Sequence, residues 1–326
     1  MTRTRGMVLG KFLPLHKGHE YLISFARHYV DELYVVVGTL EDEPIPGRLR
    51  YEWVKESFPG ARVIHLDKEL PQEPHEHPDF WGLWQRSLEE VLPVNPDLVF
   101  ASEGYGFKLA EVLGARFVPV DMSRLEFPIS GTQIRQNPFG HWEFLAAASR
   151  SYYLKRVCIF GPESCGKTTL ARALAERYGT IMVPEYARTH LDSQNGDISQ
   201  KDIPLIAKGH LASEKALLKH ANRMAFLDTD LLLTTIWSRW LYDDCPEWIQ
   251  REALDRSADL YILVGIDTPW VDDGVRYLPT ERQSFLERCH DVLTSAGKPF
   301  VFVEGSHHDR MASVEVAIRE NFGEFF

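Results

Sequence analysis

The chain has 326 residues, of which 44 % are hydrophobic and 25 % charged, as is typical of packed globular domains, and its length predicts two of them. The formal net charge of −11 argues against a broad nucleic-acid or anionic-membrane surface, because both require surplus lysine and arginine. Four scattered cysteines without a C-x-x-C pair disfavour a disulfide scaffold or a zinc site, and no apolar run approaches the ~18 residues of a membrane span. We therefore expect a cytoplasmic protein without nucleic-acid or membrane partners.

Short apolar runs alternate with helical patterns through the first half of the chain. The runs are rich in valine, isoleucine or leucine, which suits a parallel sheet that is buried on both faces. The predicted strands are Met7–Gly10, Leu33–Thr39, Ala61–Leu66, Leu98–Ser102 and Phe117–Val120. The predicted helices are His19–Tyr29, Leu49–Phe58, Phe80–Val91 and Phe107–Leu113. This alternation predicts an α/β domain.

The pattern restarts in the second half of the chain. The predicted strands there are Val157–Phe160, Met224–Leu227, Leu260–Val264 and Phe300–Val303, and the predicted helices are Lys167–Tyr178 and Val314–Phe322. No strand is predicted in Phe139–Lys155, between the two series. We therefore place the domain boundary near Tyr152, which divides the chain into residues 1–151 and 152–326.

The sequence G-K-F-L-P-L-H-K-G-H, from Gly10 to His19, joins the first predicted strand to the first helix. Gly10 allows a sharp turn and a close approach of a ligand to the backbone, and the helix N-terminus favours an anion. His16 and His19 are three residues apart, so they share a helix face and could donate to phosphate oxygens. Two surface histidines are the alternative, but α/β sheets bind ligands at this first turn. The pattern resembles the nucleotidyltransferase superfamily with the H-x-G-H signature.

A second segment, I-S-G-T-Q-I-R, runs from Ile129 to Arg135. Ser130 and Thr132 can cap a helix and also donate to phosphate, and Arg135 offers a bidentate fork to a pair of phosphate oxygens. A plain capped helix with an exposed arginine is the alternative. In the nucleotidyltransferase superfamily, an element similar to this one closes over the triphosphate.

The sequence G-P-E-S-C-G-K-T-T, from Gly161 to Thr169, follows a predicted strand and opens a predicted helix. This is the G-x-x-x-x-G-K-T pattern of a P-loop in its required strand-loop-helix context. The loop amides are expected to cradle phosphate, Lys167 to reach the β- and γ-phosphates, and Thr168 to ligate Mg²⁺. The motif alone does not separate kinases from ATPases or GTPases.

Carboxylates near the ends of predicted strands are candidates for the acceptor site of this second domain. Glu185 and Arg188 lie in E-Y-A-R, after the apolar segment Ile181–Val183, and Asp228 and Asp230 lie in L-D-T-D. Either aspartate could complete the Mg²⁺ shell or accept a proton from a substrate hydroxyl, because the ligand crevice opens at the strand ends. Surface ion pairs are the alternative for these residues.

A later loop supplies further candidates. Trp270, Asp273 and Arg276 lie in W-V-D-D-G-V-R, and Arg282 follows shortly after. Trp270 could stack on a flat or cationic ring, or else fill the core. Arg276 and Arg282 could cover the transferring phosphoryl group as a lid.

Taken together, the chain resembles the NadR family, which joins a nicotinamide-mononucleotide adenylyltransferase to a ribosylnicotinamide kinase. The motifs above carry the resemblance, with S-E at Ser102–Glu103 and V-D at Val120–Asp121. It implies an H-x-G-H nucleotidyltransferase domain with a Rossmann-like sheet, followed by a P-loop kinase domain. The implied catalytic residues are His16, His19, Arg135, Lys167 and Asp230, with Thr168 as metal ligand.

The resemblance also implies the binding residues of both domains. In the first domain, ATP is expected to contact Gly10, Lys11, Phe12, His16, His19, Ser130, Thr132 and Arg135. In the second domain, ATP is expected to contact Gly161, Glu163, Ser164, Cys165, Gly166, Lys167, Thr168, Thr169, Arg276 and Arg282. The substrate is expected to contact Glu185, Arg188, Asp228, Asp230, Trp270 and Asp273.

Two reactions follow from the resemblance. The kinase would phosphorylate ribosylnicotinamide with ATP, and the adenylyltransferase would join the resulting mononucleotide to AMP, giving NAD and pyrophosphate. ATP and Mg²⁺ are the expected cofactors, and a homo-oligomer is possible. Some relatives begin with a helix-turn-helix domain; here the first predicted strand begins by about Met7, which leaves no room for one.

Two other interpretations remain open at this point. One is a different nucleotidyltransferase, such as a pantetheine-phosphate or flavin adenylyltransferase, fused to a different small-molecule kinase. The other is a regulator that senses ATP and NAD and has one degenerate catalytic domain. The identity of the acceptor separates the first from the NadR interpretation, and turnover separates the second.

Overall fold

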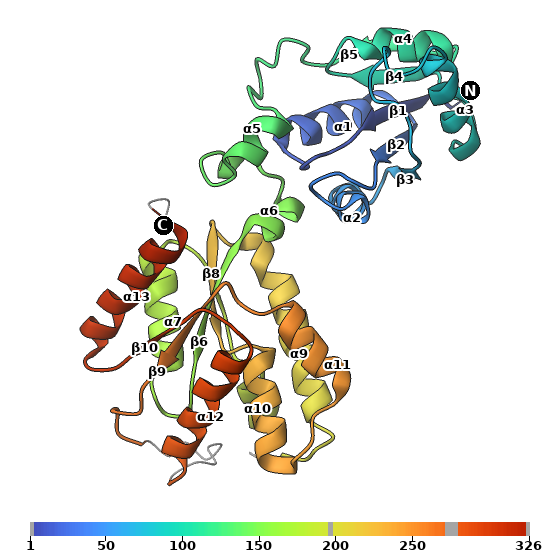
Figure 1. Cartoon of the computed structure of the whole chain (residues 1–326). Helices are drawn as coiled ribbons and strands as arrows, with labels where there is room; N and C mark the ends of the chain where they lie inside the picture. The colour runs from blue at the N-terminus through green and yellow to red at the C-terminus, as the bar shows by residue number, and fades with distance from the viewer. Residues whose placement is uncertain (1–2, 195–197, 271–279, 324–326) are drawn as a thin grey trace. The chain divides into compact units, whose positions relative to one another are not determined.

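The computed structural model describes residues 3–194, 198–270 and 280–323 (Figure 1). The chain forms two compact units, Met1–Tyr152 and Tyr153–Phe326, and each is built on its own five-stranded sheet of parallel strands. The predicted α/β class with two parallel-sheet domains is therefore confirmed. None of the helices in the described ranges is long and apolar enough to cross a membrane.

The first unit has the strand order β3-β2-β1-β4-β5. Its strands are β1 (Arg5–Gly10), β2 (Glu32–Thr39), β3 (Arg62–Asp67), β4 (Leu98–Ala101) and β5 (Arg116–Pro119). Its helical elements are α1 (Lys17–Tyr29), α2 (Gly47–Ser57), α3 (Phe80–Val91), α4 (Tyr105–Val112), α5 (Gly131–Gln136) and η1 (Trp142–Phe144). Helix α6 (Ala147–Tyr153) leads along the chain into the second unit.

Alternate residues of the first sheet face two different helix layers, as the period of a strand requires. Met7, Tyr34 and Val99 pack against Leu88 of α3 and Leu109 of α4 in one buried cluster. On the other face, Phe100 of β4 meets Phe25 of α1, with ring centroids 6.3 Å apart. The chain winds from β1 toward β3 and then returns to β4 and β5, so its direction switches between β1 and β4. Ligands of such sheets bind at the carboxyl ends of strands at this switch point.

The second unit has the strand order β10-β9-β6-β8-β7. Its strands are β6 (Lys155–Phe160), β7 (Met182–Val183), β8 (Met224–Asp228), β9 (Leu260–Val264) and β10 (Phe300–Val303). Its helical elements are α7 (Lys167–Arg177), α8 (Tyr186–Asp192), α9 (Ile203–Leu217), η2 (Leu218–His220), α10 (Leu231–Tyr242), α11 (Glu247–Asp255), α12 (Arg282–Ser295) and α13 (His307–Phe322).

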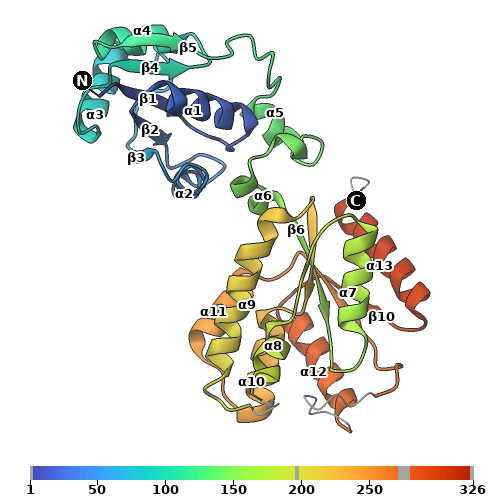
Figure 2. The ribbon, with the colours of Figure 1, turned by 180° about the vertical axis from the view of Figure 1, so that it is seen from behind.

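Helices α7 and α13 cover one face of this second sheet, and α9 to α12 lie on the other side (Figure 2). Leu170 and Leu174 of α7 join Val314 and Ile318 of α13 in a single buried cluster on the first face. Strand β6 lies at the centre of the sheet, paired with β8 and β9. The loop after β6 therefore opens at the carboxyl edge, next to the ends of β8 and β9.

Candidate active sites

The first unit contains a cleft of about 710 Å³ at the carboxyl ends of its strands. It is lined by all eight residues that the sequence assigns to ATP in this unit: Gly10, Lys11, Phe12, His16, His19, Ser130, Thr132 and Arg135. Glu103 and Asp121, which follow β4 and β5, line it as well. The structure thus brings together two motifs that are more than a hundred residues apart in the sequence.

His16 and His19 form the floor of this cleft. His16 occupies the N-cap position of α1 without a capping hydrogen bond from its side chain, and His19 lies in the first turn of this helix. The two imidazoles are stacked with centroids 3.7 Å apart. Both Nδ1 atoms are buried, and neither has a hydrogen-bond partner among the residues that the structure describes. Burial and the nearby Arg124 lower the pKa of His16 to about 4, and burial, His16 and Arg124 lower the pKa of His19. Both rings are therefore neutral at pH 7, and a buried nitrogen without a partner is suited to a ligand.

Helix α5 is held against the first motif. Ser130 caps this helix through a capping box with Gln133, and Arg135 donates from Nη1 to the carbonyl of Leu13 and from Nη2 to Thr132 Oγ1 at 3.1 Å. A side chain on Gly131 would place its Cβ 2.5 Å from the Leu13 carbonyl oxygen, so glycine is needed for this close approach. The guanidinium of Arg135 is thereby fixed at the edge of the cleft.

One wall of this cleft is aromatic, and the sequence analysis did not find it. Phe80, Trp81 and Trp84 of α3 line the cleft, and the indole of Trp84 donates to the carbonyl of Pro71 at 2.9 Å. Tyr105 lines it too, and its hydroxyl donates to the carbonyl of Leu9 at 2.7 Å. The i, i+3 spacing of Trp81 and Trp84 could have indicated this wall, but a helix that packs on the core shows the same spacing.

The loop after β6 in the second unit has the backbone of a phosphate-binding loop. Gly161 and Gly166 adopt φ values of +136° and +89°, which other residues rarely reach, and Gly166 directly precedes α7. The ammonium group of Lys167 is buried and donates to the Pro162 carbonyl at 2.6 Å. The lysine is thus folded back onto the loop that carries it.

Thr168 and Asp228, two residues that the sequence analysis offers as Mg²⁺ ligands, are hydrogen-bonded to each other. The hydroxyl of Thr168, in the first turn of α7, donates to Asp228 Oδ2 at 2.6 Å. The other oxygen, Asp228 Oδ1, is buried and has no hydrogen-bond partner among the described residues. A buried carboxylate oxygen left over in this way fits a divalent cation, which prefers oxygen ligands.

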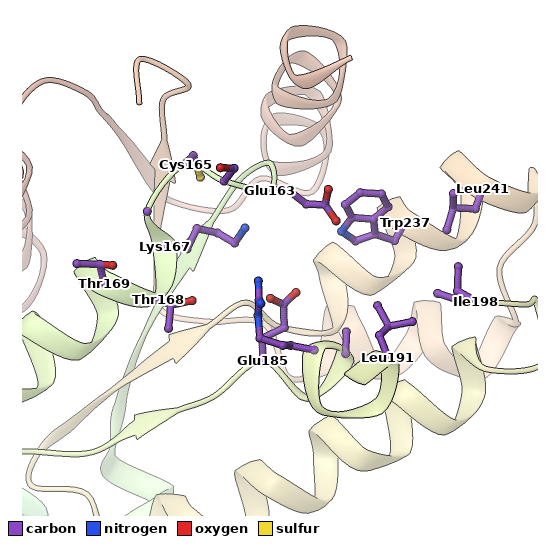
Figure 3. A pocket seen from close by; sticks show the side chains of 14 residues that line it. Glu163, Cys165, Lys167, Thr168, Thr169, Glu185, Leu191, Ile198, Trp237 and Leu241 are labelled. Atoms are coloured by element: carbon purple, nitrogen blue, oxygen red, sulfur yellow. The ribbon is translucent and has the colours of Figure 1, made fainter. Parts of the chain in front are cut away.

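A cavity of about 170 Å³ lies beside this loop (Figure 3). Its polar side contains loop residues from Glu163 to Thr169 together with Glu185 and Arg188. Its apolar side is formed by Ala187, Leu191, Ile198, Trp237 and Leu241. Figure 3 shows Lys167 and Glu185 projecting into the space that Trp237 closes on the opposite side. Burial raises the pKa of the Glu185 carboxyl, and the neighbouring Lys167 opposes this shift.

Among the remaining predicted residues of the second unit, those that the structure describes lie outside the cavity lining. Gly161 begins the loop, and Asp230 caps α10 with both carboxylate oxygens engaged by protein groups. Arg282 donates to the carbonyls of Ser164 at 3.1 Å and Thr268 at 3.0 Å, and its guanidinium lies 5.9 Å from the ring centroid of Trp270. Asp273 and Arg276 lie outside the described residues.

Two residues at the P-loop went unnoticed in the sequence. Arg310 of α13 donates to the Cys165 carbonyl at 2.6 Å and pairs with Asp267, so it braces the loop from behind. Trp237 of α10 lines the cavity and packs on Phe285, with ring centroids 4.3 Å apart. Arg310 lies far from any motif in the sequence. Trp237 lies in a helix that is apolar nearly all round. Neither residue therefore belongs to a sequence pattern that indicates a binding site.

Comparisons with known proteins match both units of the chain. A family model described as an AAA domain matches residues 156–310. The trifunctional NAD biosynthesis/regulator protein NadR of Escherichia coli is 33 % identical and covers 99 % of this chain, which spans 84 % of that protein. The nicotinamide-nucleotide adenylyltransferase of Pyrococcus horikoshii is 27 % identical over 56 % of this chain and 99 % of its own length.

Solved structures show the same fold. A NadR protein in complex with NR superimposes with a TM-score of 0.75 at 23 % identity, covering 98 % of this chain and 96 % of its own. A NadR protein in complex with NAD and AMP-PNP gives a TM-score of 0.74, covering 99 % and 97 %. The structural likeness extends over both units of the chain.

Proposed function

The chain belongs to the NadR family, and we propose that it is a bifunctional enzyme of NAD biosynthesis. Its second unit phosphorylates ribosylnicotinamide with ATP to nicotinamide mononucleotide. Its first unit transfers the adenylyl group of ATP to that mononucleotide, releasing NAD and pyrophosphate. The observation that carries this proposal is that a NadR relative of 33 % identity aligns with 99 % of the chain, so the alignment spans the segments of both candidate sites.

In the first unit, the reaction requires no protein nucleophile, because a phosphate oxygen of the mononucleotide attacks the α-phosphorus of ATP. His16, His19 and Arg135 are placed as donors to the phosphates, and they stabilise the charge that develops as pyrophosphate leaves. Trp81 and Trp84 offer flat apolar faces to the planar nicotinamide ring. This division gives the cleft one polar wall for phosphates and one aromatic wall for the base.

In the second unit, the 5′-hydroxyl of ribosylnicotinamide attacks the γ-phosphorus of ATP, and ADP leaves. We assign to Lys167, whose ammonium group lies at the P-loop, the contact with the transferred phosphoryl group. Glu163 of the loop and Glu185 both line the cavity, and we assign the proton of the attacking hydroxyl to Glu185, which directly precedes α8 and its apolar lining residues Ala187 and Leu191. Thr168 and Asp228 would hold Mg²⁺, which would neutralise part of the negative charge of the ATP phosphates.

Trp237 completes the acceptor side of the kinase cavity. The nicotinamide ring of ribosylnicotinamide is flat and cationic, and such a ring gains from an aromatic face. Trp237 lies across the cavity from Glu185 and among the apolar side chains of α8 and α10 (Figure 3). The four cysteines are buried free thiols, as is usual in the reducing cytoplasm, where we place both reactions.

The direct test is incubation of the protein with ATP, Mg²⁺ and ribosylnicotinamide, with the products followed by mass spectrometry. We expect nicotinamide mononucleotide to appear first and NAD to follow. A parallel panel of other ribonucleosides and of other adenylyl acceptors should give much slower turnover. Efficient phosphorylation of another nucleoside, or ATP binding without any product, would overturn the proposal.

A further inference from the structure

The carboxylate of Asp230, two residues beyond Asp228, is completely engaged by protein groups. Its Oδ1 accepts hydrogen bonds from the backbone amides of Leu232 at 2.9 Å and Leu233 at 3.3 Å, which caps α10. Its Oδ2 accepts the hydroxyl proton of Tyr261 at 2.5 Å. Asp230 is only 4 % exposed, and it is not among the described residues that line the kinase cavity. Both oxygens already accept hydrogen bonds from protein groups, and the carboxylate lies outside the described cavity lining, so it is poorly placed to receive a proton from a bound substrate.

Tyr261 is held as firmly as its partner. It lies on β9, is fully buried, and meets Phe160 of β6 edge-on with ring centroids 5.3 Å apart. Its hydroxyl oxygen accepts the backbone amide of Ala258 at 3.1 Å. Because that bond occupies the oxygen, the single hydroxyl proton is directed to Asp230. The pair thus joins β9 to the first turn of α10.

Between the two aspartates, the backbone takes an unfavourable turn. Thr229 has a φ of +73°, in a region that β-branched residues rarely adopt, and its amide donates to the Ile159 carbonyl at 3.1 Å. Such a conformation persists only where the flanking contacts hold it. Here it sends the Asp228 carboxylate toward Thr168 and the Asp230 carboxylate toward Tyr261.

We propose that Asp230 and Tyr261 form a positioning clamp that sets Asp228 against Thr168 and fixes the first turn of α10, the helix that carries Trp237. Asp230 is then a positioning residue and not the proton acceptor, a role that the sequence analysis left open to it. This inference rests on the proposed kinase function, but its nucleotide-binding part needs no acceptor.

The test compares Asp230→Asn and Tyr261→Phe, singly and together, with Tyr178→Phe as the matched control. Tyr178 ends α7, at the opposite end of that helix from Lys167 and Thr168. Asparagine is as good a helix cap as aspartate, so Asp230→Asn keeps the cap of α10 and loses only the carboxylate oxygen that accepts the Tyr261 hydroxyl proton. AMP-PNP binding is measured by calorimetry at a series of Mg²⁺ concentrations, and phosphorylation of ribosylnicotinamide is measured as kcat and KM across pH.

A clamp predicts that each single variant raises the Mg²⁺ concentration for half-maximal nucleotide binding about three- to tenfold, as for one lost hydrogen bond. The double variant should lose no more than the larger single effect, because both changes break one contact. The pH profile of kcat and the adenylyl transfer by the first unit should not change. Tyr178→Phe should match the wild type in every measurement.

Three results would overturn the clamp. One is a fall in kcat of about 10²- to 10⁴-fold in Asp230→Asn with Tyr261→Phe at the wild-type level, as expected of a general base. The others are additive effects in the double variant and an unchanged Mg²⁺ dependence in folded single variants, with folding checked by thermal unfolding. If ribosylnicotinamide is not phosphorylated by the wild type but the shift in Mg²⁺ dependence appears, the clamp stands and the proposed acceptor is wrong.

Discussion

The imidazole rings of His16 and His19 are stacked 3.7 Å apart at an interplanar angle of 27°, in the floor of the cleft of the first unit. Burial and Arg124 lower the pKa of His16 to about 4, whereas the unfolded chain has a histidine pKa near 6.5. The folded state therefore requires the neutral ring. Its contribution to stability is fully present above pH ~6.5 and is lost as the pH falls toward 4.

We accordingly expect the free energy of unfolding of the first unit to depend less on pH below 6.5 in His16→Asn than in the wild type. Between pH 6.5 and 4 the wild type should lose up to about 3 kcal/mol more than the variant, since one pKa unit is worth about 1.4 kcal/mol. Thermal unfolding at a series of pH values measures this difference, and the carboxylates common to both proteins cancel. Parallel pH profiles for the two proteins would contradict the low pKa of His16.

His19→Ala or Arg135→Ala should slow adenylyl transfer by about 10²-fold or more, the scale of losing one preorganised donor. Ribosylnicotinamide phosphorylation by the same proteins serves as the internal control and should stay near the wild-type rate. Arg135 also anchors α5 through the Leu13 carbonyl, so Arg135→Lys should recover only part of the loss. NAD synthesis at the wild-type rate in both alanine variants would remove the phosphate-binding role assigned to these residues.

Lys167→Ala should abolish phosphorylation of ribosylnicotinamide, because its ammonium group is the one cation of the P-loop motif itself. NAD formation from supplied nicotinamide mononucleotide should continue, since the cleft of the first unit is lined by residues of that unit. Both reactions are measured on one preparation by mass spectrometry. Loss of both activities in a folded variant would show that the two sites are not independent.

Much of this architecture is readable from the sequence. All nine predicted strands are present, with ends within two residues of those predicted. Strands of a parallel sheet are buried on both faces, so they stand out in the sequence as short continuous runs of branched apolar residues. Helices α8 to α12 were not predicted. Helix α10, for example, reads L-L-L-T-T-I-W-S-R-W-L-Y, and a helix that is apolar nearly all round lacks the period by which helices are recognised.

The motifs predicted where the proposed phosphate sites lie, whereas the cavity walls could be identified only from the fold. Gly161 to Thr169 and Gly10 to His19 are local in the sequence, so turn chemistry and spacing identify them. Arg310 reaches the Cys165 carbonyl across 145 residues, and Trp237 reaches the cavity from a helix without a motif. Contacts of this kind depend on the tertiary packing of helices and leave no local pattern.

Glu185→Gln should lower kcat of the kinase by about 10²- to 10⁴-fold, the usual contribution of a general base. The KM for ATP should change little, because glutamine preserves the shape of the cavity. Burial raises the pKa of Glu185 above its ordinary value, so wild-type kcat should fall as the pH drops through this raised pKa, and the residual rate of the variant should be flat there. A variant that keeps both its rate and the wild-type pH dependence would exclude Glu185 as the base.

The last prediction concerns the two tryptophans that could face the nicotinamide ring. The sequence analysis gave this role to Trp270, and the cavity of the second unit is lined by Trp237. An aromatic face is worth roughly 0.5–2 kcal/mol to a cationic ring, which is a several-fold change in affinity. Trp237→Ala should therefore raise the KM for ribosylnicotinamide several-fold while the KM for ATP stays close to that of the wild type.

Matched variants separate stacking from packing. Trp237 also packs on Phe285, so Trp237→Ala is compared with Trp237→Phe, which keeps a ring in the cavity and should recover much of the affinity. Trp270→Ala removes the ring next to Arg282, whose guanidinium donates to the Ser164 carbonyl of the P-loop, so its effect should fall on the KM for ATP. Initial-rate measurements with each substrate varied in turn distinguish these outcomes. A rise in the KM for ribosylnicotinamide in Trp270→Ala alone, with Trp237→Ala unchanged, would return the stacking role to Trp270.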